Sequence, residues 1–188
     1  IAAWRNRGVR SRLWWITLGI GIGIPFQGVI GGITVLTQLN PFVVALHLLL
    51  SVALIVICVW SIQVASRPVG IPVAPLQKAA VIATFVASML AIWVGTVVTG
   101  SGPHAGDLKA VRTGFDIEAV ARLHGLSAWL VVALTLVTLW LVRGNAELRK
   151  VMLIVLGTVL LQCAIGYIQY FLGVPAVIVA LHMVGLSL

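Results

Sequence analysis

The stretch Phe42–Ile62 reads FVVALHLLLSVALIVICVWSI and contains no charged residue in 21 positions. An α-helix rises 1.5 Å per residue, so about 20 apolar residues are enough to cross the hydrocarbon core of a bilayer. One ionisable residue, His47, interrupts the apolar run near its beginning. The stretch therefore predicts a membrane-spanning helix that carries a single histidine.

The rest of the chain has the same apolar character. Of its 188 residues, 61% are hydrophobic and 9% are charged, and the mean hydropathy is +1.17. A soluble domain has about a quarter of its residues charged, so this composition excludes a water-soluble enzyme, a disordered tail and a disulfide scaffold. Because the bilayer core offers no water, backbone groups must bond internally, which favours helices.

We expect an all-α integral membrane protein. Six apolar runs predict transmembrane helices, at Leu13–Thr37, Phe42–Ile62, Leu76–Thr99, Ala119–Val142, Leu148–Leu172 and Pro175–Leu188. Nine of the 12 Lys and Arg residues lie before the first run, or in loops on that same side and the first three residues of the runs that follow them. The positive-inside rule therefore places the beginning of this chain in the cytoplasm. The net charge of +8 then indicates contact with anionic lipid, and nucleic acid is not expected as a partner.

An internal repeat relates the first two expected helices to the last two. At an offset of 135 residues, Gln27 aligns with Gln162, and the sequence VALH ending at His47 aligns with VALH ending at His182. The copies begin four helices apart, so they share one orientation and form a parallel repeat.

A four-helix unit repeated once requires eight helices, of which six are expected here. We therefore expect two four-helix bundles, with the first represented by its second half. The predicted division is the second half of the N-terminal bundle over 1–66, a cytoplasmic linker over 67–75 and the C-terminal bundle over 76–188.

Three histidines lie at a common depth in the expected helices. His47, His124 and His182 are each about five to eight residues inside the same end of their helices, or roughly 8–12 Å deep. An ionisable residue inside a membrane helix is a functional hypothesis by default. The alternative is a neutral histidine that only bonds a neighbouring helix.

The other residue types favour haem over other metals at these histidines. All four acidic residues lie in loops, so a carboxylate-assisted metal site lacks its ligands in the spans. Haem needs only one or two histidines and an apolar slot, which a four-helix bundle provides. We expect His124 and His182 to face each other as axial ligands. His124 lies 58 residues before His182. The same spacing places the partner of His47 about 11 residues upstream of Ile1.

Two further residues have open interpretations. Arg122 is either a partner for haem propionates or an ordinary interfacial arginine. His104 lies in a loop rich in turn residues and is either a solvated histidine or part of a lid over the haem edge.

Four segments resemble those of bacterial haem A synthases, in particular of the actinobacterial type. They are Gly95–Asp107 (GTVVTGSGPHAGD), Gln27–Thr37 (QGVIGGITVLT), Asn40–His47 (NPFVVALH) and Leu123–Gly125 (LHG). The resemblance covers essentially the whole chain. It implies an eight-helix protein made of two four-helix bundles, each with a pair of histidines.

The resemblance also implies an activity and its site residues. His124 and His182 match the pair that binds a haem b cofactor. His47 matches one of the pair that binds the substrate, haem O, and is the expected catalytic residue. The implied reaction oxidises a methyl group of haem O to a formyl group, which gives haem A for terminal oxidase assembly. The family's first histidine and a nearby acidic residue have no counterpart in this sequence, so we expect the catalytic bundle to be incomplete.

The same resemblance implies a location and partners. The location is the bacterial plasma membrane, as a multi-pass protein. The partners are the lipid bilayer, haem O synthase, terminal oxidase subunits and further copies of the chain.

Without the resemblance, the residues leave two alternatives open. The histidines fit a di-haem b-type membrane cytochrome that transfers electrons from quinol. The repeat by itself fits a transporter, although Pro25 in one copy aligns with Leu160 in the other, which weakens this hypothesis.

Overall fold

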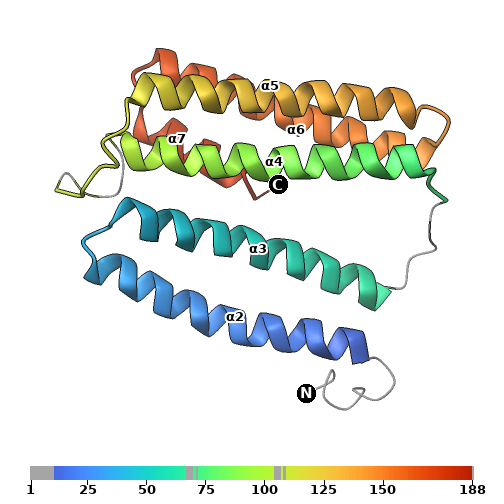
Figure 1. Cartoon of the computed structure of the whole chain (residues 1–188), viewed down its shortest axis with the longest axis horizontal. Helices are drawn as coiled ribbons and strands as arrows, with labels where there is room; N and C mark the ends of the chain where they lie inside the picture. The colour runs from blue at the N-terminus through green and yellow to red at the C-terminus, as the bar shows by residue number, and fades with distance from the viewer. Residues whose placement is uncertain (1–10, 67–69, 71, 104–106, 108, 188) are drawn as a thin grey trace. The chain divides into compact units, whose positions relative to one another are not determined.

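The computed structural model describes residues 11–66, 70, 72–103, 107 and 109–187. These residues form helices and connecting turns without a strand, which confirms the all-α prediction. The helices are α2 (Ser11–Leu36), α3 (Pro41–Ser66), α4 (Pro75–Ser101), α5 (Ile117–Leu141), α6 (Ala146–Phe171) and α7 (Ala176–Gly185) (Figure 1).

Five of these helices, α2 to α6, are long and apolar enough to cross a membrane. The chain is therefore a multi-pass membrane protein. The sixth expected span is present as α7, an apolar helix of 10 residues. Ten residues rise only about 15 Å, so α7 reaches about half way through a hydrocarbon core.

The described residues fall into two compact units. One unit contains α2 and α3, which pack against each other (Figure 1). The other contains α4 to α7, in which each helix packs along the next one in the sequence. The predicted bundle boundaries stay predictions, because the expected linker over 67–75 lies partly outside the described residues.

The core of the second unit is built from small side chains between α4 and α5. Ala87, Ala91 and Val131 form its centre. Beside them the hydroxyls of Thr84 and Thr138 lie 3.0 Å apart in a buried hydrogen bond between the helices. Small residues let the backbones of membrane helices approach closely, where van der Waals contact replaces the hydrophobic effect that lipid cannot supply. Most large apolar side chains point outward instead, as expected of helices that face lipid.

Local polar groups determine where several helices begin. Asp116 caps α5 by accepting a hydrogen bond from the backbone N–H of Ala119, and Asn145 caps α6 by accepting one from Leu148. Pro75 occupies the first turn of α4. Backbone N–H groups in a first turn have no partner within the helix, so proline, which lacks this group, is tolerated there.

The 135-residue repeat reappears in the turns that end α2 and α6. Gln38 and Leu39 have φ of 54° and 59°, and the aligned residues Gly173 and Val174 have φ of 72° and 62°. Three backbone hydrogen bonds around each turn also align. In the first turn, the backbone N–H groups of Thr37, Gln38 and Leu39 donate to the carbonyls of Ile33, Val35 and Thr34. In the second turn, those of Leu172, Gly173 and Val174 donate to the carbonyls of Ile168, Tyr170 and Gln169. The two copies therefore share backbone conformation as well as sequence.

The left-handed turn makes a prediction for Gly173. A side chain in this conformation costs about 1–2 kcal/mol, which glycine avoids. We expect Gly173→Ala to lower the free energy of unfolding by about 1 kcal/mol, measured by denaturation in mixed detergent micelles. Gln38→Ala is the matched control, because Gln38 already has a side chain at the aligned position. An equal loss in both variants would contradict this explanation.

Candidate functional site

The structure brings two of the three predicted histidines together. The ring centroids of His124 on α5 and His182 on α7 lie 6.2 Å apart, with the ring planes at 90°. Among the described residues, no Cα atom of α5 lies within 8 Å of one of α7. The two helices therefore meet through these side chains while their backbones stay apart.

The ring of His124 is held by α4. Its Nδ1 lies 3.1 Å from the carbonyl oxygen of Ala91. A carbonyl can only accept, so Nδ1–H donates and Nε2 keeps its lone pair in the neutral ring. The ring edge also lies against Gly95, where an added Cβ would come 3.0 Å from His124 Cε1. Because Gly95 has no side chain, the imidazole can lie directly on the backbone of α4.

His182 lies against a glycine in the same way. An added Cβ on Gly166 of α6 would come 3.5 Å from His182 Cε1. The Nδ1 atom of His182 is buried and has no hydrogen-bond partner. The two facing rings thus differ, since only that of His124 has its orientation fixed by a hydrogen bond.

His47 lies in the other unit, with surroundings like those of His182. An added Cβ on Gly31 of α2 would come 3.4 Å from His47 Cε1, and His47 Nδ1 is buried without a hydrogen-bond partner. Gln27 donates through Nε2 to the carbonyl oxygen of His47 at 3.3 Å and to Ser51 Oγ at 2.8 Å. A hydrogen bond from Ser51 Oγ to the same carbonyl, at 2.9 Å, completes this cluster.

The glycines beside the histidines are the site residues that sequence reasoning missed. Gly31 and Gly166 align in the repeat, and each lies 16 residues before its histidine. That shared spacing was the available signal. Gly95 offered no such signal, because a longer connection separates it from His124.

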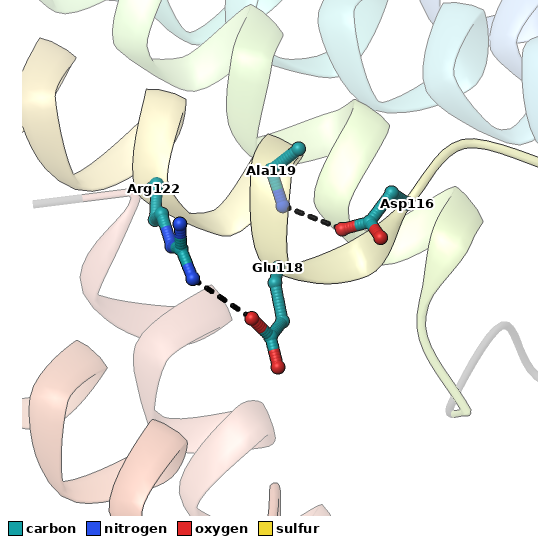
Figure 2. Close-up of polar contacts among 4 residues, drawn as sticks. All are labelled: Asp116, Glu118, Ala119 and Arg122. Atoms are coloured by element: carbon teal, nitrogen blue, oxygen red, sulfur yellow. Dashed lines mark hydrogen bonds and ion pairs between the residues drawn. The ribbon is translucent and has the colours of Figure 1, made fainter.

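Charged residues lie around the first two turns of α5, the helix that carries His124. Figure 2 shows Asp116 capping the helix and Arg122 paired with Glu118, one turn before it, at 2.9 Å. The Arg122 side chain is 74% exposed. Exposed pairs of this kind contribute at most about 0.5 kcal/mol on a helix, so Arg122 can exchange Glu118 for another anion at little cost. His104 lies outside the described residues.

These helices and histidines can be compared with known proteins. The family model described as COX15-CtaA, cytochrome oxidase assembly protein, matches residues 1–188. The chain belongs to this family. The match confirms the resemblance seen in the sequence motifs.

A curated relative of this COX15-CtaA chain is the protein named heme A synthase from Sinorhizobium fredii. The two are 29% identical over 214 aligned positions, which cover 97% of this chain and 58% of the relative. The chain thus spans little more than half the length of the curated relative it matches. No solved structure matches the chain.

The contact between Gly95 and His124 makes a testable prediction. A Cβ at 3.0 Å from the ring must displace it, and overpacking of this kind costs about 1–3 kcal/mol. We expect Gly95→Ala to lower the free energy of unfolding in micelles by about 1 kcal/mol.

The matched control is Gly157→Ala on α6, where an added Cβ meets nothing within 4 Å. There the better helix propensity of alanine should raise the free energy of unfolding by up to about 1 kcal/mol. If both variants are stabilised alike, the ring of His124 does not depend on the glycine.

Proposed function

We propose that this chain is the haem-binding part of a haem A synthase, an oxidoreductase that converts a methyl group of haem O into the formyl group of haem A. The observation that carries the proposal is the facing pair His124 and His182 in a chain of the COX15-CtaA family. The name of the Sinorhizobium fredii relative supports it.

The facing rings fit an iron between them. With metal–nitrogen bonds of about 2 Å and ring radii of about 1 Å, two imidazoles that would hold one metal ion between them have centroids at most about 6 Å apart. The separation of 6.2 Å between His124 and His182 agrees with this value. Two neutral imidazoles without a carboxylate are a donor set typical of b-type haem. The residues present therefore fit the cofactor.

The residues of the chain would then have the following roles. His124 and His182 bind haem b, with Nε2 of His124 available because its Nδ1–H is taken by Ala91. Arg122 neutralises a propionate at the mouth of the site by leaving Glu118. When bound, haem b supplies one-electron transfer. The apolar helices around the pair exclude water and keep the imidazoles neutral.

His47 would bind the iron of the substrate haem O in the first bundle. It lies against Gly31 as His182 lies against Gly166, so the two sites share one design. Holding the porphyrin by its iron fixes the position of the reacting methyl group, which is the contribution a binding site makes to such a reaction. With water as the source of the oxygen atom, converting the methyl group to a formyl group releases four electrons and four protons. A nearby redox group is therefore required.

We further propose the bacterial plasma membrane as the location, with the beginning of this chain on the cytoplasmic side. The excess of Lys and Arg on that side supports this orientation. The family description, an oxidase assembly protein, supports haem O synthase and terminal oxidase subunits as partners. We also propose that copies of the chain associate as a homo-oligomer.

Haem content tests the assignment of the pair. In full-length protein purified from membranes, we expect His124→Ala and His182→Ala each to lose most of the haem b measured as pyridine haemochrome. Removing one of two axial ligands leaves a single bond to the iron and an open coordination position. Cys58→Ala on an exposed face of α3 is the control and should keep its haem. Unchanged haem b in both histidine variants would overturn the site.

Product analysis tests the activity. Full-length protein produced together with a source of haem O should yield haem A or a hydroxylated intermediate by chromatography. His47→Ala should abolish this product while it keeps haem b, because the substrate ligand and the cofactor ligands are different residues. Haem b without any modified haem in the wild-type protein would instead support a di-haem cytochrome.

A further inference from the structure

Two pairs of packed helices each contain a buried acceptor and a buried ring nitrogen without hydrogen-bond partners. On α2 and α3 these atoms are Gln27 Oε1 and His47 Nδ1, and on α6 and α7 they are Gln169 Oε1 and His182 Nδ1. Leaving a buried polar atom unpaired destabilises a folded protein, so such atoms need an explanation. Here each helix pair holds one atom of each kind, which complement each other.

The first glutamine already contacts its histidine. Gln27 Nε2 donates to the carbonyl oxygen of His47 and to Ser51 Oγ, so the amide lies beside the backbone of His47. Its nitrogen is fully used by these two acceptors. The amide oxygen is the part of the side chain left to bond the imidazole.

The second glutamine lies on the helix face that holds its histidine. Gln169 follows Gly166 by three residues, and residues three apart lie on the same face of a helix. That face lies against His182, because Gly166 contacts its ring. Helical side chains lean toward the start of their own helix, which directs the side chain of Gln169 back toward Gly166.

His124 shows what the other two histidines lack. Its Nδ1–H already has an acceptor in the carbonyl of Ala91. A ligating histidine usually donates its second N–H to a carbonyl or carboxylate, which fixes the tautomer and makes the metal-binding nitrogen more basic. No backbone carbonyl bonds Nδ1 of His47 or His182 in the described part of the chain.

We propose that Gln169 and Gln27 are positioning residues whose side-chain carbonyls accept the hydrogen bond from Nδ1–H of His182 and His47. The bond leaves Nε2 of each ring for iron. The inference rests on the proposed function, because it takes axial ligation as the role of these histidines.

The repeat makes this arrangement specific to each site. Gln169 aligns with Thr34, whose hydroxyl donates to the carbonyl of Gly31 and makes no hydrogen bond with His47 Nδ1. Gln27 aligns with Gln162, whose side chain lies against Gly185. The proposed acceptor for His47 is Gln27, which lies four residues before Gly31. The proposed acceptor for His182 is Gln169, which lies three residues after Gly166. Gln162 is then a matched control for Gln169 on the same helix.

The midpoint potential of bound haem b tests the pair Gln169 and His182 in the full-length protein. We expect Gln169→Leu to raise the potential, because a less basic imidazole stabilises the ferric form less. Haem affinity should fall about ten- to a hundredfold, as is typical when such a hydrogen bond is lost. Gln162→Leu should change neither quantity. Gln169→Glu keeps a carbonyl acceptor and should hold the potential at or below the wild-type value.

Two results would overturn the proposal. In one, Gln169→Leu keeps both the wild-type potential and the wild-type haem affinity. In the other, Gln162→Leu shifts them by as much as Gln169→Leu does.

The tautomer of the imidazole gives a test that does not need haem. In haem-free full-length protein labelled with ¹⁵N-histidine, the ring signals of His182 should report the Nδ1–H tautomer. Gln169→Leu should shift them toward a mixture of tautomers, and Gln27→Leu should do the same for His47. Unchanged signals would refute the hydrogen bonds. A wild-type protein that binds no haem would refute the proposed function alone, since the tautomer is measured independently.

Discussion

The contact between each intramembrane histidine and a glycine on the preceding helix is the constraint on which the site depends. Gly31, Gly95 and Gly166 leave room for an imidazole ring against the backbone of α2, α4 and α6. In lipid, helices associate through close packing and a few hydrogen bonds, so a bulky ring between two helices needs a partner without a side chain. No Cα atom of α5 lies within 8 Å of one of α7 among the described residues, and the rings of His124 and His182 meet between the two helices.

The repeat places one kind of helix pair in two different polar surroundings. The α2–α3 and α6–α7 pairs share the left-handed turn, its three backbone hydrogen bonds, the glycine and the histidine. They differ in the polar residues nearby, because Ser51 and Gln27 bond the backbone of His47, whereas the α6–α7 pair contains Gln169, whose Oε1 is buried without a hydrogen-bond partner. A common scaffold thus places each histidine, and different polar residues near the ring distinguish the two proposed sites.

The electrostatics of the site follow from where the charges lie. The apolar helices hold imidazoles and amides, and the acidic residues Asp116 and Glu118 remain at the exposed beginning of α5. The ion pair of Arg122 with Glu118 is solvent-exposed and weak, so the guanidinium is available to another anion.

The sequence by itself determined the class of fold, the position of the spans and the candidate ligands. Long apolar runs such as Phe42–Ile62 locate helices because hydrophobicity is a local property, and His47, His124 and His182 stood out because ionisable residues are rare in such runs. Only the tertiary structure decided that His124 meets His182, that Ala91 fixes the tautomer of His124, and that Gly95 lies beneath its ring. The physical reason is that these helices are apolar on nearly every side. In a soluble protein the apolar stripe shows which face of a helix is buried, whereas in lipid the facing side is chosen by the fit of small residues and a few polar atoms.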